Sequence, residues 1–280
     1  MFLVLFFCYI MSRFAEIKFI SVIVPVYHGA KTIEHDINQV NTALFQLDIP
    51  YEIIVVVDGI IDKTFDKALK MIKKNKYLSV VGYPHNKGKG YAVRYGMARS
   101  KGDIIAFIDA GSDIQPQGLA MLLEHLSWYN ADIVVGSKRH PVSKVNYPFD
   151  RKIFSWGYQM LIKILFGLSV RDTQVGMKLY RRTVLEDVLP RLLVKRFAFD
   201  IEILAVARHL GYTRIYDAPI ELDFAGVSTI TSVEVWKVLL NMLWDTMAIY
   251  YRLHILHYYD TSNKRKWIFD PELNFRINVA

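Results

Sequence analysis

The chain is poor in cysteine and has none of the common nucleotide-loop or zinc-protease motifs. Its 280 residues include one cysteine, Cys8. A single cysteine excludes an intrachain disulfide and a cysteine-rich zinc site. The eight histidines show no HExxH spacing, and neither a Walker loop nor a GxGxxG loop occurs. Nothing therefore indicates a zinc protease, a P-loop ATPase or a dinucleotide-dependent dehydrogenase.

The chain also lacks an apolar run long enough to span a bilayer. Residues 1–11 are almost wholly apolar, but Ser12 and Arg13 end the run. A spanning helix needs about 20 apolar residues. The segment has no basic start and no small-residue cleavage site, so it is a poor signal peptide. We expect residues 1–18 to form a short apolar leader; an interfacial anchor and a true start at Met11 stay open as alternatives.

The second apolar stretch, 235–259, is interrupted by polar residues at helical spacing. Lys237, Asn241, Asp245 and Arg252 are spaced by 4, 4 and 7 residues, which places them on one stripe of a helix. This pattern predicts an amphipathic helix within a helical tail, 231–280. Its apolar face packs on its own domain, on a second copy in a homodimer, or in a membrane interface.

Composition indicates a packed domain with an anionic partner. Hydrophobic residues make up 52% of the chain and charged residues 22%, which excludes global disorder. The formal net charge of +8 suits nucleotide phosphates, anionic lipid or nucleic acid, and it is also compatible with ordinary solubility charge.

Apolar runs rich in Ile and Val alternate with helical patterns in the first half of the chain. The predicted strands are 20–26, 51–57, 78–83, 104–108 and 133–135, and the predicted helices are 32–47, 63–74, 91–99 and 117–128. Such alternation predicts an α/β domain, 19–230, with a mostly parallel, Rossmann-like sheet flanked by helices. Ligands of such sheets lie beyond the carboxyl ends of the strands.

The second half reads as more helical. Helices are predicted over 153–166, 183–189 and 200–210. The segment 153–166 carries one charge, Lys163. It is either a core helix or a membrane-facing element.

Polar residues follow the predicted strands where a ligand would bind. Asp109 and Asp113 follow the fourth strand, where they indicate either a Mg²⁺ or Mn²⁺ site or an ordinary turn. Lys89 and Arg94 follow the third strand and suit the charge of a diphosphate.

Three segments give the chain a family resemblance: NKGKGYAVR at 86–94, DTQVGMK at 172–178 and FDIE at 199–202. In this order and spacing they resemble the family-2 glycosyltransferases of the GT-A fold. Within that family the chain is most similar to polyprenyl-phosphate sugar transferases, the dolichyl-phosphate mannose and glucose synthases. The resemblance covers about 21–228, most of the chain.

The resemblance implies a role for each matching residue. Asp109 and Asp113 would hold the divalent cation on the donor diphosphate, and Asp172 would lie near the transferred sugar with Gln174 close by. Arg139 and Arg151 would bind anionic groups of donor or acceptor. The nucleotide pocket would be lined by Pro25, Val26, Tyr27 and Asp58.

The sequence departs from the family pattern at several of these positions. Val57 replaces the first aspartate of the second-strand motif, and Gly111 replaces the second aspartate of the Asp-x-Asp motif. The late loop 224–228 lacks the arginine usual before its Gly-x-Ser. The site of the cation is therefore expected at Asp109 and Asp113.

These observations predict an inverting hexosyltransferase. The donor would be a nucleotide-sugar of the GDP-mannose or UDP-glucose type, and the acceptor a polyprenyl or dolichyl phosphate. The enzyme would lie peripherally at the cytoplasmic, inner face of a membrane, and no nucleic acid would bind. Two alternatives stay open: transfer to a saccharide hydroxyl, which requires a carboxylate base, and a non-catalytic nucleotide-sugar-binding scaffold.

Overall fold

The computed structural model describes residues 16–111, 114–140, 143, 149–221, 232–263, 266–271, 273 and 275–279. For 149–155, 232–239, 266–267 and 275–279 it describes the backbone only. The predicted leader, except for its last residues, lies outside this range, as does the late loop 224–228.

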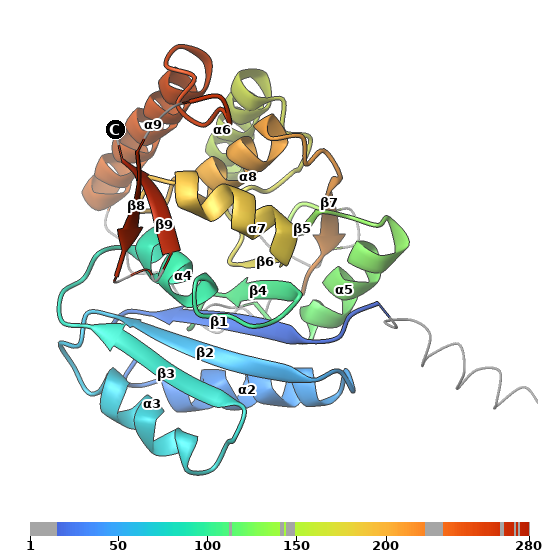
Figure 1. Ribbon diagram of the computed structural model, residues 1–280, viewed down its shortest axis with the longest axis vertical. Coiled ribbons are helices and arrows are strands. Elements are labelled where there is room, and N and C mark those ends of the chain that lie inside the picture. Colours follow the sequence, from blue (N-terminus) through green and yellow to red (C-terminus); the bar gives the residue numbers. More distant parts are fainter. Residues whose placement is uncertain are drawn as a thin grey trace, which may run out of the picture.

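A seven-stranded sheet in the order β3-β2-β1-β4-β6-β5-β7 forms the centre of the molecule (Figure 1). Of these strands only β6 runs antiparallel to its neighbours, β4 and β5. The strand bounds are β1 Ile20–Val26, β2 Tyr51–Asp58, β3 Leu78–Tyr83, β4 Ile104–Ile108, β5 Ile133–Ser137, β6 Met177–Arg181 and β7 Ile215–Pro219.

The five predicted strands are confirmed, and burial on both faces explains their composition. Every residue of β1 and of β4 is buried, so near-continuous Ile, Val and Phe replace the alternation of a half-exposed strand. The sequence analysis did not predict β6 and β7. Both are five residues long, and β6 carries the charged residues Lys178 and Arg181.

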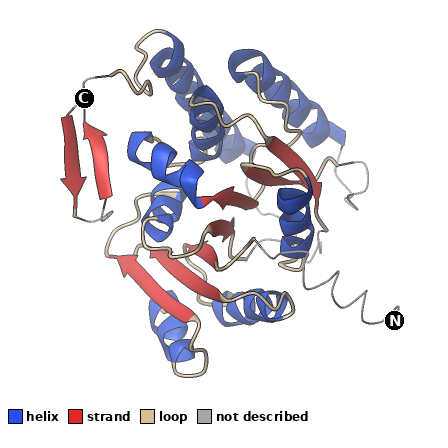
Figure 2. Cartoon of the chain, turned by 45° about the vertical axis from the view of Figure 1, so that its right-hand side comes forward, coloured by secondary structure: helices blue, strands red, loops and turns tan. Residues whose placement is uncertain are grey.

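Helices cover the sheet on both faces, as Figures 1 and 2 show. Helices α2 and α3 lie on one side of the β1–β3 half, and α4 lies on the other side against β1 and β2. The helix bounds are α2 Ile33–Phe45, α3 Thr64–Ile72, α4 Lys89–Met97, α5 Gly118–Trp128, α6 Phe149–Phe166, α7 Arg182–Val188, α8 Phe199–His209 and α9 Ser232–His254, with a 3₁₀ turn η1 at Leu189–Arg191.

The topology collects the predicted polar loops at one edge of the sheet. Strands β1, β2, β4 and β5 run in the same direction, so their carboxyl ends meet there. Because β6 runs the other way, its amino end, preceded by the segment 172–176, reaches the same edge.

The tail is helical only in its first part. Helix α9 confirms the predicted amphipathic helix, but an antiparallel hairpin of β8 Lys266–Asp270 and β9 Phe275–Val279 follows it. The segment FRINV alternates apolar and polar residues, a strand signal that the helical reading of the tail overlooked.

The tail packs onto the α/β domain through a buried carboxylate. Glu202 of α8 is fully buried and accepts hydrogen bonds from the backbone N–H groups of Leu193 and Val194, 3.0 and 2.9 Å away. The hydroxyl of Tyr259, which follows α9, donates to the same carboxylate over 2.7 Å. Tyr259 is itself fully buried. The tail is therefore fastened to α8 and to the loop before it.

We predict that Tyr259→Phe lowers the free energy of unfolding by about 1–3 kcal/mol, because it removes one hydrogen bond from a buried carboxylate. Urea denaturation followed by circular dichroism measures the change. The control is Tyr251→Phe on α9, where the side chain is 51% exposed. Equal stabilities of wild type and Tyr259→Phe would contradict this role.

Candidate active site

A cavity of about 990 Å³ opens at the carboxyl edge of the sheet. Its walls are the ends of β1, β2 and β4, the loop before α4, the loop before α8, and one side of α9. The lining residues are Pro25, Val26, Tyr27, Asp58, Asn86, Lys87, Gly88, Lys89, Ala92, Asp109, Ala110, Gly111, Arg196, Phe197, Asn241, Met242 and Asp245. Six of the residues predicted to bind the donor are thus brought together: Pro25, Val26, Tyr27, Asp58, Lys89 and Asp109.

Asp58 organises the wall of the cavity nearest β2. Its carboxylate accepts hydrogen bonds from the backbone N–H groups of Lys87 and Gly88, at 2.7 and 3.0 Å, and from the Asn86 side chain at 3.0 Å. The Tyr83 hydroxyl adds a fourth at 3.0 Å. Asp58 therefore lines the cavity, and its buried carboxylate shapes the 86–88 loop.

Gly88 allows two loops to meet over the cavity. Its φ is +98°, a backbone conformation that favours glycine, and a Cβ there would lie 2.5 Å from the carbonyl oxygen of Lys195. The N–H of Tyr91 donates to that same carbonyl. The loop that carries Arg196 and Phe197 is held against the 86–88 loop in this way.

Asp109 lies at the tip of β4 in a tightly defined position. Its backbone N–H donates to the carbonyl of Gly176 over 2.9 Å, which joins β4 to the segment before β6. A Cβ on Gly176 would lie 2.3 Å from Asp109 Oδ2, so only glycine leaves room for this carboxylate. The Asp109 side chain is 29% exposed, and its Oδ2 accepts a hydrogen bond from Lys89 Nζ at 2.8 Å.

Lys89 and Asp109 belong to a chain of four charged groups that runs into the core. Lys89 Nζ also lies 3.3 Å from Asp200 Oδ2, and Asp200 Oδ1 accepts a 2.6 Å hydrogen bond from Lys178. Burial disfavours the ammonium of Lys89, but the carboxylates of Asp200 and Asp109 outweigh it and raise its pKa. Burial lowers the pKa of Lys178, and Asp200 offsets part of that effect.

The cavity offers an oxygen ligand for a hard cation. In the described part of the chain, no cluster of three or more metal-ligating side chains occurs. Asp109 Oδ1 accepts no hydrogen bond from the described residues, so one carboxylate oxygen is available to a cation beside Lys89. A Mg²⁺ or Mn²⁺ ion completed by diphosphate oxygens and water fits such a site. The other predicted ligand, Asp113, lies outside the described residues.

The segment 172–176 is close to the cavity edge but does not line it. Asp172 Oδ1 accepts a hydrogen bond from the backbone N–H of Gln174 at 3.3 Å. The amide nitrogen Nε2 of Gln174 is buried and has no hydrogen-bond partner among the described residues. Such a donor costs free energy unless a ligand satisfies it, so Gln174 stays a candidate for contact with the sugar.

The predicted arginines differ in their placement. Arg94 is not among the residues that line the cavity; its guanidinium is buried, donates to the carbonyl of Leu189 over 3.3 Å and lies near Glu202. Its proposed contact with the diphosphate thus has no support in this geometry. Arg139 follows β5, and its N–H donates to the Ser137 hydroxyl. The side chain of Arg151, in the first turn of α6, lies outside the described residues.

The structure adds lining residues that the sequence analysis did not assign. Arg196 and Phe197 come from the loop before α8, and Asn241 and Asp245 from α9. The spacing of Asn241 and Asp245 had placed them on one polar stripe, but spacing alone gave no sign that this stripe faces the site. Arg196 precedes the recognised 199–202 segment by three residues, and no local signal marks it.

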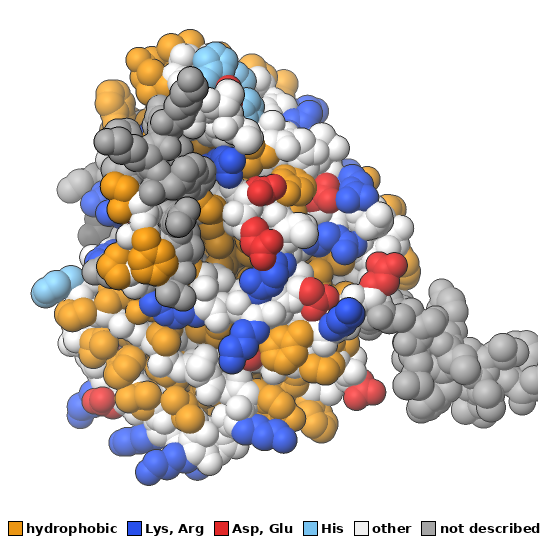
Figure 3. Space-filling view, in the orientation of Figure 1, with side chains coloured by type: hydrophobic (Ala, Val, Ile, Leu, Met, Phe, Trp, Pro, Cys, Tyr) orange, Lys and Arg blue, Asp and Glu red, His pale blue; other side chains and the backbone are white. Residues whose placement is uncertain are grey.

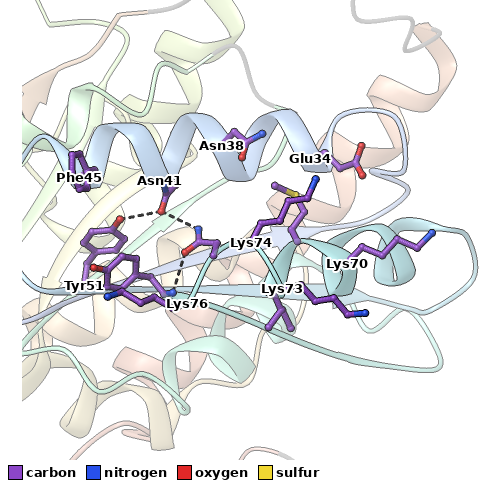
Figure 4. A pocket seen from close by; sticks show the side chains of 13 residues that line it. Glu34, Asn38, Asn41, Phe45, Tyr51, Lys70, Lys73, Lys74 and Lys76 are labelled. Atoms are coloured by element: carbon purple, nitrogen blue, oxygen red, sulfur yellow. Dashed lines mark hydrogen bonds between the residues drawn. The ribbon is translucent and has the colours of Figure 1, made fainter.

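A second cavity of about 850 Å³ lies between α2 and α3, near the amino ends of β2 and β3 and away from the carboxyl edge of the sheet (Figure 4). The amide oxygen of Asn41 accepts hydrogen bonds from Tyr51 and Asn75 at its base. Lysines 70, 73, 74 and 76 surround it, and Figure 4 shows their side chains spreading apart rather than converging on one point. No aspartate lies among the residues that line this second cavity, and its lysines do not point toward a common centre. We therefore do not regard it as the candidate active site.

Comparison with known proteins shows the family of the chain. Residues 21–189 match the family model for glycosyl transferase family 2. The chain belongs to this family. It is a glycosyltransferase, and the resemblance predicted from its sequence is confirmed.

Relatives with curated names are sugar transferases. A dolichyl-phosphate beta-glucosyltransferase of Trichomonas vaginalis is 29% identical over 248 residues, a match that covers 85% of this chain and 75% of that enzyme. The enzyme of the same name from Drosophila melanogaster is 34% identical over 205 residues, covering 68% of this chain and 63% of that one. Another from Trichomonas vaginalis is 30% identical and covers 82% and 71%.

Solved structures confirm the GT-A fold of this family-2 glycosyltransferase. Glucosyl-3-phosphoglycerate synthase of Mycobacterium tuberculosis, in complex with Mn²⁺, UDP and its product, aligns with a TM-score of 0.66 at 20% identity over 86% of this chain and 82% of that one. Mannosyl-3-phosphoglycerate synthase of Rubrobacter xylanophilus aligns with a TM-score of 0.66 at 15% identity over 96% and 88%. At these identities the likeness concerns the fold.

The edge strand β7 contains a carboxylate whose ionisation opposes folding. Burial raises the pKa of Asp217, on β7, from 3.8 to about 6, although the N–H of Arg171 donates to both its oxygens at 3.0 Å. The charge of nearby Asp172 also favours the protonated form. Because the folded-state pKa is raised, this group stabilises the fold most below pH 3.8, and its contribution is lost as pH rises through about 6.

We therefore predict that the free energy of unfolding of wild type falls relative to Asp217→Asn between pH 4 and 7. The expected relative change is about 2–3 kcal/mol, from about two pKa units at 1.36 kcal/mol each. Urea denaturation at several pH values measures the difference. A difference that does not vary with pH would show that Asp217 ionises with an ordinary pKa.

Proposed function

We propose that this glycosyltransferase moves a hexose, with inversion, from a nucleotide-sugar to a polyprenyl phosphate of the dolichyl type. UDP-glucose is the donor that we favour over GDP-mannose, because the named relatives are glucosyltransferases. The observation that carries the proposal is the position of α9. One side of this helix lines the candidate donor cavity, and the opposite side presents apolar residues to the exterior.

The cavity suits a nucleoside diphosphate-sugar. Tyr27 is 50% exposed at the end of β1 and offers an aromatic face to a base. Lys89 and Arg196 supply positive charge for the diphosphate. Asp109 would hold Mg²⁺ or Mn²⁺, which supplies positive charge against the diphosphate leaving group.

The proposed transfer reaction does not require a general base. A phosphate oxygen of the acceptor attacks the anomeric carbon as the bond from that carbon to the diphosphate oxygen breaks, so the nucleoside diphosphate leaves with the electron pair. The acceptor phosphate is already anionic near neutral pH, so no proton has to be removed. Fixed basic side chains such as Lys89 stabilise the charge that develops on the leaving group. Asp172 and Gln174, which lie close to the edge of the cavity, would orient the sugar.

Two neighbouring helices each carry exposed apolar residues at helical spacing, which suit a lipid. On α9, Leu240, Trp244, Met247 and Tyr251 lie on one stripe, with Trp244 77% exposed. On α6, the exposed residues Trp156, Met160 and Ile164 follow one another at intervals of four. The two helices are joined by a 2.7 Å hydrogen bond between Tyr158 and Thr246. These seven exposed residues are named here the apolar face.

We propose that the apolar face rests on a membrane surface at its cytoplasmic side. None of the helices in the described ranges combines the length and the apolar character needed to cross a bilayer. An amphipathic helix that rests in the interface buries one apolar side and keeps its polar side in water. Hydrophobic side chains also gather at the top of the molecule in Figure 3. Ile255 and Leu256, which directly follow α9, are exposed as well.

The transfer reaction is tested with purified protein, Mn²⁺ and radiolabelled UDP-glucose or GDP-mannose, with dolichyl phosphate or a soluble saccharide as acceptor. We predict that label from UDP-glucose enters an organic-extractable, acid-labile lipid. Asp109→Asn should lower turnover at least about 100-fold, because several kcal/mol of charge stabilisation depend on the cation. Label in the soluble saccharide alone would replace the lipid acceptor, and full activity of Asp109→Asn in EDTA would refute the cation site.

Flotation with vesicles of phosphatidylcholine and phosphatidylserine tests the apolar face. We predict that wild type floats with the vesicles and that Trp244→Asp and Ile164→Asp each bind at least about tenfold more weakly, since each places a charge in the buried side of an interfacial helix. Trp128→Asp on α5 is the matched control, because Trp128 is also exposed but lies outside the apolar face. If wild type stays unbound and sediments as a dimer that Trp244→Asp dissociates, the face is a homodimer interface instead.

A further inference from the structure

The ammonium of Lys89 lies beside the carboxylate of Asp109, the predicted ligand of the divalent cation. Lys89 therefore places a positive charge next to the site where the cation would bind. Its ammonium lies 2.8 Å from Asp109 Oδ2 and 3.3 Å from Asp200 Oδ2, and only 17% of the side chain is exposed. Its Nζ also lies 5.1 Å from the centre of the Phe107 ring, within cation–π range. Three independent contacts therefore hold this ammonium in place.

The aspartate is held as firmly as the lysine. The N–H of Asp109 is bonded to Gly176, and the carboxylate lies where any side chain at position 176 would collide with it. The backbone of Asp109 is therefore fixed against the segment before β6, and its carboxylate lies in the space that Gly176 leaves open beside Lys89. A cation that binds Asp109 has to share that carboxylate with the ammonium.

The four charged groups linked by these ion pairs have no net charge. Asp109 and Asp200 supply two negative charges, and Lys89 and Lys178 supply two positive charges. Lys178 is fully buried, and its ammonium donates to the carbonyl of Val175 as well as to Asp200, both at 2.6 Å. A divalent cation that binds Asp109 therefore meets a cluster of zero net charge, with the ammonium of Lys89 2.8 Å from the other oxygen of the same carboxylate.

We propose that Lys89 is a built-in counter-ion that makes cation binding at Asp109 conditional on the nucleotide diphosphate. This inference rests on the proposed function, since it assumes a diphosphate donor. Without the diphosphate, the ammonium neutralises Asp109 and repels a second cation. With the diphosphate, new oxygens are available both to the cation and to Lys89, so the two positive charges no longer compete for one carboxylate.

The physical basis is the charge balance of the site. Two unit charges a few ångströms apart interact by several kcal/mol at an effective dielectric constant of about 20. Even after screening, loss of one positive charge beside Asp109 changes its affinity for a divalent cation by a measurable factor. Coupling between cation and nucleotide is reciprocal, so Lys89 also sets how much the cation strengthens nucleotide binding.

Mn²⁺ binding measured by electron paramagnetic resonance, without turnover, tests the proposal on the full chain. We expect wild type to bind Mn²⁺ weakly alone and much more tightly with UDP. Lys89→Met should bind Mn²⁺ without UDP at least about tenfold more tightly than wild type, and UDP should then improve its binding by a smaller factor. Lys89→Gln is the second neutral variant, and circular dichroism checks that each is folded.

Lys87→Met is the charge-matched control for Mn²⁺ binding without nucleotide. Lys87 lies two residues before Lys89 and lines the same cavity, but its ammonium lies 4.6 Å from the ring centre of Tyr91. Removal of this charge should change Mn²⁺ affinity far less than removal of Lys89. An equal effect of the two variants would indicate a general charge effect and overturn the specific role of Lys89.

The remaining outcomes separate this inference from the proposed function. Unchanged or weaker Mn²⁺ binding by Lys89→Met and Lys89→Gln without UDP overturns the inference. Wild type that binds Mn²⁺ equally well with and without UDP overturns it without any variant. In both cases, transfer of label from UDP-glucose to dolichyl phosphate by wild type would leave the proposed function standing.

Discussion

The ion chain Lys178–Asp200–Lys89–Asp109 joins four separate elements at the centre of the molecule. Lys178 comes from β6, Asp200 from α8, Lys89 from α4 and Asp109 from the tip of β4. Charged groups withdrawn from water cost several kcal/mol each unless each finds its partner, so these elements have to meet in one arrangement. The ion pairs that link Lys178 of the antiparallel strand β6 to α8 and α4 therefore also fix the position of Asp109, which faces the cavity.

Helix α9 combines two surfaces that are usually kept apart. Asn241 and Asp245 face the candidate donor cavity, while Leu240 and Trp244, one residue before each, face outward. A surface helix of a water-soluble domain normally turns its apolar stripe inward. Here part of that stripe, with Ile249 and Leu253, is buried, and a second apolar stripe is left outside. The arrangement suits an enzyme whose two substrates come from water and from a lipid phase.

Much of the fold was predictable, because near-continuous Ile and Val runs between helical patterns allow few other architectures. The tips of β1, β2 and β4 were predictable for the same reason: polar residues directly after buried strands meet at one edge. The residues whose roles could not be predicted from the sequence are those whose environment is set by the tertiary structure. Lys178 and Asp200 are charged residues in apolar surroundings, and their burial is explained by contacts formed only in the folded molecule, with each other, with Val175 and with Lys89. Arg94 follows a glycine-rich loop like a phosphate ligand, yet helix α4 turns it toward Leu189 and Glu202, away from the cavity.

The hydrogen bond between Tyr259 and Glu202 affects the order in which parts of the molecule can fold during synthesis. Glu202 fixes the backbone at Leu193 and Val194, and Arg196 and Phe197, a few residues further on, form a wall of the cavity. Tyr259 lies 57 residues after Glu202 in the chain. During synthesis from the amino end, the sheet and its aspartates are therefore made before the residue that secures this wall. A nascent chain therefore contains the strand ends that line the candidate donor cavity before it contains Tyr259, which stabilises the wall formed by Arg196 and Phe197.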